Sequence, residues 1–246
     1  MTTSENNNPV TISIVTATYN AAACLPGLIE SLLKQTDQDI EWVIADGASD
    51  DDTLALLNSV SDIKVSISSQ ADFGIYDALN RAIKASTGEY YLVVGADDVL
   101  APDAIALFRE IAHGQHPDLI SAKVMAEGRL CRVRPNKPWL YGGFAYVNSH
   151  AVGTLIKKSL HDKFGMYSRS YPLVADQLFF KKVGDAGAKI VSADFVAGEY
   201  GVQGTSSSDV LGVLTEDFRI QVSTGENKLV QAVLFVLRMI KLFRKF

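Results

Sequence analysis

Short apolar segments that predict strands alternate with helical segments over the first hundred residues of this 246-residue chain. Strands are predicted at residues 10–17, 41–45, 64–68 and 90–95, and helices at 25–34 and 76–86. This alternation is typical of an α/β fold with a mostly parallel, doubly wound sheet and helices on both faces. The fold class constrains any site, because such sheets bind ligands beyond the carboxyl ends of their strands.

The pattern becomes mixed after a predicted helix at residues 102–112. We expect a hairpin from residues 119–127 and 131–134 around Gly128, then a helix at 173–183 and a strand at 190–200. The polar residues 1–9 are predicted to be disordered. No composition break divides residues 10–225, so we expect one domain there, followed by a helical tail at 226–246.

Two adjacent carboxylates, Asp97 and Asp98, follow the fourth predicted strand. Like charges side by side repel unless a cation or solvent compensates them. Mg²⁺ or Mn²⁺ holding a diphosphate is the economical explanation, because these ions prefer oxygen ligands and are often shared with substrate phosphates. The alternative is a polar turn that opens the next helix at Pro102.

Other polar residues are expected at the same edge of the sheet. Thr16, Thr18 and Asn20 follow the first strand and Asp46 ends the second, where they could hydrogen-bond a base or ribose. Simple turn chemistry explains the first three equally well. The sequence has no glycine-rich phosphate loop of the known kinds, so a metal would have to compensate the phosphates. Arg81 could meet a phosphate, although a surface ion pair is the commoner fate of such an arginine.

Four segments resemble glycosyltransferase family 2, which has the GT-A fold, in the family's order and spacing: residues 14–20, 45–51, 72–80 and 95–98. The resemblance implies inverting transfer of a sugar from a nucleotide-sugar donor with Mg²⁺ or Mn²⁺. It implies that Asp46 binds the base, that Asp98 binds the metal, and that Asp97 lies nearer the donor ribose or sugar. Asp72, in the third segment, is a further donor-binding candidate.

The second half of the chain carries two more matches to the family. Asp176, within residues 174–180, resembles the acidic motif whose aspartate is the catalytic base; a plain carboxylate at a helix N-terminus is the alternative. His150 resembles a histidine that contacts the donor diphosphate or the metal, and a histidine satisfied by backbone groups is the alternative. Residues 201–207 resemble a mobile lid, or form an ordinary connector.

Charge is unevenly distributed along the chain. The net charge of −5 argues against nucleic acid as a partner, yet residues 226–246 carry five Lys or Arg against one Glu. In this tail the residues Leu229, Val233, Val236, Ile240 and Phe243 form an apolar seam, and the opposite face carries Lys228, Gln231, Arg238, Lys241 and Lys245. We expect a basic amphipathic helix that attaches to a membrane surface without spanning it. Packing on the body and a dimer seam are the alternatives.

Together these features predict a transferase that moves a sugar, most often from a UDP-sugar in this family, to a glycan or lipid-linked acceptor in cell-surface polysaccharide biosynthesis. The polar start and the presence of only two cysteines, Cys24 and Cys131, favour a cytoplasmic location, peripheral at the inner face of the membrane. A catalytically silent relative that acts as a membrane-associated assembly scaffold is the alternative. A nucleotidyltransferase is disfavoured because its Gly- and Arg-rich loop is absent. The sugar, the acceptor and a homo-oligomeric state stay open.

Overall fold

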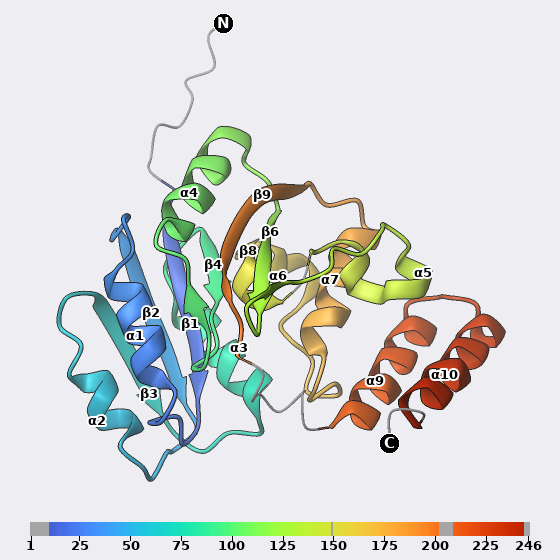
Figure 1. The fold of residues 1–246 in the computed structure, drawn as a ribbon, viewed down its shortest axis with the longest axis horizontal. Coiled ribbons are helices and arrows are strands. Elements are labelled where there is room, and N and C mark those ends of the chain that lie inside the picture. Colours follow the sequence, from blue (N-terminus) through green and yellow to red (C-terminus); the bar gives the residue numbers. More distant parts are fainter. Residues whose placement is uncertain (1–9, 149, 202–208, 244–246) are drawn as a thin grey trace, which may run out of the picture.

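The computed structural model describes residues 10–148, 150–201 and 209–243 (Figure 1). The disorder predicted for residues 1–9 therefore lies outside the described residues. Within them, one nine-stranded sheet runs in the order β3-β2-β1-β4-β8-β6-β9-β5, with β7 paired to β6. The strands are β1 Ile12–Thr18, β2 Ile40–Asp46, β3 Lys64–Ser69, β4 Tyr90–Val93, β5 Val99–Leu100, β6 Leu119–Ala126, β7 Arg129–Leu130, β8 Thr154–Lys157 and β9 Ile190–Glu199.

The first half of the sheet is parallel, as the alternating pattern predicts. Strands β3, β2, β1 and β4 pair in parallel, and Thr18, Asp46 and Ser69 occupy matching register positions at their carboxyl ends. All seven residues of β2 are buried, which explains its nearly continuous apolar sequence. The aligned strand ends bring side chains from three separate segments to one edge.

The second half of the sheet is mixed. Strand β8 pairs antiparallel with both β4 and β6, whereas β6 and β9 pair in parallel. A hairpin forms around Gly128 as predicted, with β6 and β7 paired antiparallel across Glu127 and Gly128, which both have positive φ. Its second strand is Arg129–Leu130, whereas the predicted strand at residues 131–134 does not form. The fold is thus a mixed α/β sheet of the GT-A type.

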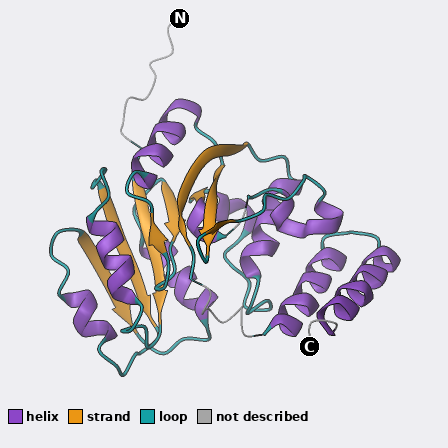
Figure 2. Ribbon diagram, viewed as in Figure 1, coloured by secondary structure: helices purple, strands orange, loops and turns teal. Residues whose placement is uncertain are grey.

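Helices cover both faces of the sheet (Figure 2). On one face α1, α2 and α4 contribute Leu28, Leu57 and Phe108 to one buried cluster; on the other, α3, α6 and α7 contribute Leu79, Leu160 and Phe179 to a second. The helices are α1 Leu25–Leu33, α2 Thr53–Asn58, α3 Ile75–Ala85, α4 Ala104–Gln115, α5 Pro138–Tyr141, α6 Leu160–Phe164, α7 Ala175–Asp185, α9 Val210–Ser223 and α10 Lys228–Phe243, with short 3₁₀ turns η1 Gly142–Ala145 and η2 Ala151–Gly153.

The two C-terminal helices, α9 and α10, lie side by side at one end of the molecule (Figure 1). Helix α9 packs on α7, where Ile220 meets Val174 and Leu178 in a small third cluster. The rings of Phe218 on α9 and Phe235 on α10 have centroids 5.2 Å apart. The tail therefore forms the predicted helix and also packs on the body.

The orientation of α10 differs from the simplest expectation for an amphipathic helix. Its polar residues Gln231 and Arg238 face the body, where they donate hydrogen bonds to the carbonyl oxygens of Trp139 and Leu140. The predicted apolar seam faces outward instead: Leu229 is 80% exposed and Val233 60% exposed. Gln231 and Arg238 thus lie opposite the apolar seam, as predicted, and they face the body because backbone carbonyl oxygens of α5 offer these side chains partners that an apolar residue could not use.

Candidate active site

Asp46 ends β2 and is fully buried. Its Oδ1 accepts from the hydroxyls of Thr18 and Ser49 at 2.9 and 2.5 Å, and its Oδ2 accepts from the backbone N–H of Ser49 and the hydroxyl of Ser69 at 2.9 and 2.7 Å. Burial raises the pKa of Asp46, but these hydrogen bonds outweigh it and lower the pKa below its ordinary value. The carboxylate is thus ionised and organises the strand ends.

The turns after β1 and β2 are tied together at this edge. Asn20, whose φ is +47°, donates its backbone N–H to Ser49 and accepts from the backbone N–H of Asp50. Thr18 contacts Asp46, as expected from their matching register. Thr16, in contrast, is fully buried, and its hydroxyl accepts from the indole N–H of Trp42. Thr16 therefore lies beneath the predicted site and supports the sheet.

The loop between β3 and α3 crosses the same edge. The Asp72 Oδ2 atom lies so close to Gly47 that a Cβ on this glycine would sit 3.0 Å from it. Arg81, on α3, donates to the backbone oxygen of Asp46 at 2.7 Å and to the hydroxyl of Ser68 at 3.3 Å. Its buried Nη1 has no hydrogen-bond partner among the described residues. Arg81 thus holds the backbone of the strand end and keeps one donor free.

The carboxylates after β4 are held differently. Asp98 is 1% exposed and accepts from the backbone N–H groups of Gly95 and Gly201 at 2.6 and 3.0 Å. Burial raises the pKa of Asp98; the attraction of His150 opposes this rise, and the charge of Asp97 adds to it. A Cβ on Gly201 would collide with the Asp97 carboxylate, so only a glycine at this position lets the backbone come so close to Asp97. The proposed lid begins here, and residues 202–208 lie outside the described part of the chain.

Two atoms in this group are buried without a hydrogen-bond partner among the described residues: Oδ2 of Asp97 and Nδ1 of His150. The His150 ring stacks on Tyr200 with centroids 4.5 Å apart. A free carboxylate oxygen and a free imidazole nitrogen beside Asp98 suit a divalent cation. No three His, Cys, Asp or Glu side chains of the described residues are arranged to hold a metal by themselves. A cation here would therefore need further oxygen ligands, as a diphosphate and water provide.

Asp176 stands in the first turn of α7. Its Oδ1 accepts from the Tyr76 hydroxyl at 2.7 Å and from the backbone N–H of Gln177 at 2.9 Å, and no hydrogen bond from the described residues reaches Oδ2. Burial and the neighbouring Asp176 raise the pKa of Tyr76 far above its ordinary value, so Tyr76 stays a hydroxyl donor. Tyr76 lies within the family segment 72–80, but the sequence predicts no role for it, because its partner Asp176 lies 100 residues away and leaves no local signal.

The segment of residues 70–76, which runs from the end of β3 to the start of α3, connects the surroundings of Asp46 with Asp176. At its start the backbone N–H of Gln70 donates to the backbone oxygen of Asp46, and at its end Tyr76 reaches Asp176. Six steps along the chain span at most about 20 Å, which limits how far apart the two ends of this segment can lie. Asp97 follows β4, which pairs in parallel with β1, so it reaches the same edge of the sheet. The predicted residues except Thr16 thus gather at or near the carboxyl edge of β1, β2 and β4.

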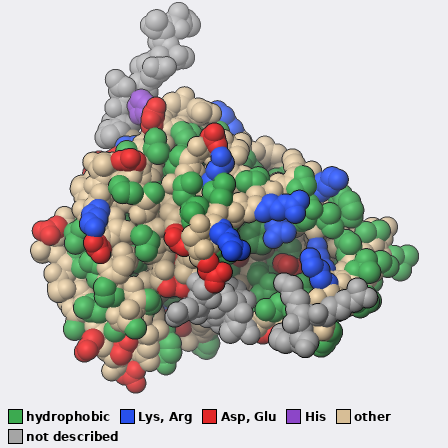
Figure 3. All heavy atoms as spheres, in the orientation of Figure 1, with side chains coloured by type: hydrophobic (Ala, Val, Ile, Leu, Met, Phe, Trp, Pro, Cys, Tyr) green, Lys and Arg blue, Asp and Glu red, His purple; other side chains and the backbone are tan. Residues whose placement is uncertain are grey.

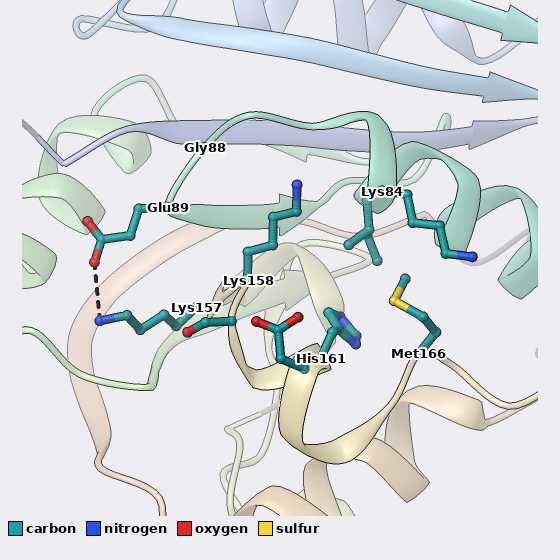
Figure 4. A pocket seen from close by; sticks show the side chains of 10 residues that line it. Lys84, Gly88, Glu89, Lys157, Lys158, His161 and Met166 are labelled. Atoms are coloured by element: carbon teal, nitrogen blue, oxygen red, sulfur yellow. Dashed lines mark ion pairs between the residues drawn. The ribbon is translucent and has the colours of Figure 1, made fainter.

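A separate cavity of about 500 Å³ lies at the other end of β4 (Figure 4). It is lined by Lys84, Lys157, Lys158 and His161, and Lys157 forms an ion pair with Glu89 at 3.2 Å. Glu89 precedes β4, whereas Asp97 follows it. This cavity is therefore not part of the candidate active site.

Comparison with known proteins agrees with this geometry. The family model described as glycosyl transferase family 2 matches residues 13–171. The chain belongs to glycosyltransferase family 2. A PGL/p-HBAD biosynthesis glycosyltransferase of Mycobacterium bovis is 39% identical over 119 residues, 46% of each chain, and the Escherichia coli chondroitin synthase is 37% identical over 98 residues, 39% of this chain and 14% of that one. The matches thus span about half the length of the first relatives or less.

Solved structures confirm the GT-A fold of this family member. The mannosyltransferase PcManGT of Pyrobaculum calidifontis, solved with GDP-Man and Mn²⁺, superposes with a TM-score of 0.70 at 18% identity, covering 93% of this chain and 69% of that one. TarS residues 1–349 of S. aureus, solved with UDP, superpose with a TM-score of 0.67 at 20% identity, covering 92% and 70%. Asp176 and all of α9 and α10 lie beyond the segment that the family model matches.

Proposed function

We propose that this protein is a metal-dependent, inverting glycosyltransferase that uses a nucleotide-sugar donor, with a UDP-sugar as the first candidate. The observation that carries the proposal is the pair of unpartnered buried atoms, Asp97 Oδ2 and His150 Nδ1, beside Asp98 at the carboxyl edge of the sheet. Related folds have been solved with UDP and with GDP-Man and Mn²⁺, so the ligand class suits this architecture.

In the proposed complex, Asp98 and the free atoms of Asp97 and His150 would lie around Mg²⁺ or Mn²⁺, and oxygens of the diphosphate and water would complete its ligands; the ion would compensate the charge of the departing diphosphate. Asp46 would meet the base, and a base N–H would replace one of its two hydrogen bonds from Ser49. Asp72 would close over the donor from the loop before α3, and the free Nη1 of Arg81 would offer a further donor.

Asp176 is the proposed catalytic base. Inversion requires a carboxylate that removes the proton of the acceptor hydroxyl while its oxygen attacks the anomeric carbon opposite the leaving group. The Tyr76 hydroxyl and the Gln177 N–H both bind Oδ1, which fixes the carboxylate and leaves Oδ2 to take the proton. A fixed carboxylate lowers the entropic cost of reaching the reactive geometry.

Thermal-shift measurements with UDP, GDP and dTDP, each with and without Mn²⁺, test the donor site. A ligand at a hundred times its Kd stabilises the native state by about 2.7 kcal/mol, which raises the Tm of a chain of this size by roughly 5–10 °C. We expect one nucleotide to give this shift only with Mn²⁺, and Asp97→Asn to abolish the Mn²⁺-dependent part. Asp194→Asn is the control, since Asp194 is exposed and pairs with Lys123.

If no nucleotide shifts the Tm, or if Asp97→Asn binds as the native chain does, the donor site is wrongly placed. An assembly scaffold without catalysis would give no metal-dependent release of nucleotide from the donor. Nucleotide release that Asp97→Asn abolishes and Asp194→Asn retains supports the enzyme.

We further propose that α10 attaches the protein to an anionic membrane surface, where a glycan or lipid-linked acceptor of cell-surface polysaccharide would be met. Its outward face exposes Leu229, Val233, Val236, Leu237 and Phe243, each by more than half. Figure 3 shows hydrophobic side chains gathered at the end of the molecule that α10 forms. Exposed apolar residues with Lys228 and Lys241 on the same helix suit the interface of an anionic bilayer. Among the described residues, no helix has the length and apolar character needed to cross a bilayer.

Flotation with phosphatidylglycerol vesicles tests this attachment. We expect Val233→Asp with Leu237→Asp to abolish flotation, while Phe235, which packs on α9, keeps the helix docked. Matched changes at exposed sites away from α10, such as Leu33→Asp on α1 with Val99→Asp on β5, should leave flotation unchanged, since α1 lies at the opposite end of the molecule (Figure 1). Flotation that survives the α10 changes refutes attachment through this face; concentration-dependent dimers that the same changes dissolve would assign the face to a second copy. The predicted cytoplasmic location stays a prediction.

A further inference from the structure

A second cavity, of about 420 Å³, lies where α7, η1, α9 and α10 meet. Its volume falls within the roughly 300–1,000 Å³ typical of small-molecule sites. The walls include Phe144 of η1, Gln177 of α7, Gln221 of α9 and Arg238 of α10. Two of these elements, α9 and α10, lie beyond residues 13–171, so the family match does not account for this cavity.

Two buried glutamine side chains present unpartnered oxygens here. Gln177 is 4% and Gln221 2% exposed, and neither Oε1 has a hydrogen-bond partner among the described residues. The orientation of Gln221 is fixed, because its Nε2 donates to the backbone oxygen of Pro138 at 2.9 Å. A buried amide oxygen without a partner is costly, which favours a ligand that donates hydrogen bonds.

Charged and aromatic groups complete the lining. Asp217 of α9 adds a third acceptor, and Arg134 lies over the rings of Tyr141 and Phe144, 5.5 and 5.2 Å from their centroids. The guanidinium of Arg238 already donates to the backbone oxygen of Leu140. Arg134 faces these rings and Arg238 a backbone oxygen, so the acceptors are the groups left for a ligand, and acceptors beside aromatic surface suit a neutral ring with several hydroxyls.

We propose that this cavity is an acceptor subsite that binds one hydroxyl-rich sugar ring through the amide oxygens of Gln177 and Gln221. The assignment of the ring to the acceptor rests on the proposed function. Gln177 directly follows Asp176, and its own N–H binds the Asp176 carboxylate, so the subsite begins beside the proposed base. Helix α10 then has two roles: its inner face closes the subsite through Arg238, and its apolar outer face is the proposed membrane contact.

Saturation-transfer NMR on the full chain tests the subsite with methyl glycosides of glucose, galactose, mannose, rhamnose and N-acetylglucosamine as probes. We expect at least one glycoside to bind and Gln221→Met to weaken it about tenfold. Gln231→Met is the matched control: Gln231 is also 2% exposed and donates Nε2 to the backbone oxygen of Trp139, yet it does not line the cavity. The Gln231→Met variant should bind the glycoside as the native chain does.

If Gln221→Met lowers the Tm more than Gln231→Met does, the variant Val213→Phe is tested in place of Gln221→Met. This change narrows the cavity and removes no hydrogen bond. The inference is overturned if no glycoside binds, if binding survives both cavity variants, or if inorganic phosphate binds instead and is lost in Gln221→Met. The Tm shift with UDP and Mn²⁺ is measured on the same samples. A UDP shift without glycoside binding refutes only the subsite, and glycoside binding without any nucleotide shift refutes only the donor site.

Discussion

Replacing Asp217 by asparagine should stabilise the protein at neutral and alkaline pH. Burial beside α10 is the largest cause that raises the pKa of Asp217, and Asp176 and Glu216 add to the rise. Arg238 and Arg134 oppose it, and the net result is a pKa of about 6 against an ordinary 3.8. The native state therefore binds the proton more tightly than the unfolded state does, so the native chain loses stability as pH rises from about 4 through 6.

The size of the effect follows from this difference. At about 1.4 kcal/mol per pH unit, a pKa of about 6 against 3.8 corresponds to a penalty of about 3 kcal/mol once Asp217 is fully ionised. Water in the cavity that Asp217 lines screens part of it, and we expect about 2 kcal/mol. For a chain of this size, Asp217→Asn should then raise the Tm at pH 8 by roughly 4–8 °C. At pH 5 the gain should be about half as large, because the native carboxyl is mostly protonated.

Differential scanning calorimetry of both proteins between pH 5 and pH 8 measures the gain. Asp194→Asn is the control with the opposite sign, because the pKa of Asp194 is lowered by its hydrogen bond and ion pair with Lys123. That variant should be no more stable than the native chain at any pH. A gain in Tm for Asp217→Asn that does not grow with pH, or a loss of Tm at pH 8, would refute the claim that the ionised carboxylate destabilises the native state.

Three further outcomes test other parts of the structure. Burial alone would raise the pKa of Glu41, but hydrogen bonds led by that of Ser13 lower it to about 2; Glu41→Gln should cost about 2–3 kcal/mol in urea unfolding at pH 7, and this cost should shrink as pH falls below 4.5. Gly184→Ala should destabilise by about 1–3 kcal/mol despite the better helix propensity of alanine, because its Cβ would collide with the Tyr146 ring; an unchanged urea midpoint would contradict this packing. Asp176→Asn should retain the UDP-dependent Tm shift yet lower transfer by about 10²–10⁴-fold, and weakened nucleotide binding with transfer intact would remove Asp176 as the base.

The parallel half of the fold could be predicted because its signals are local. A strand that is buried on both faces, such as β2, has a nearly continuous apolar sequence, and a polar residue marks its end. Parallel strands then bring Asp46 and Asp97 to one edge, so the candidate donor residues follow from strand ends alone. Thr16 shows the limit of this rule. It stands two residues before Thr18 on the same strand, yet Trp42 of the neighbouring strand covers its hydroxyl.

The antiparallel placement of β8 between β4 and β6 could not be predicted from the sequence. Pairing of strands separated by more than sixty residues leaves no local pattern, since each strand is apolar whichever neighbour it has. The contact between Tyr76 and Asp176, which orients the proposed base, is of the same kind.

By itself the sequence determined that the tail is an amphipathic helix, because the 3.6-residue period defines its apolar and polar faces. Only the tertiary structure decided which face meets the body: Gln231 and Arg238 turn inward to the carbonyl oxygens of α5, and the apolar seam turns outward. The physical reason is that a helical period is a property of one segment, whereas the choice of face depends on the groups that a distant segment presents. The cavity with the free oxygens of Gln177 and Gln221 arises in the same way, from helices that meet only after folding.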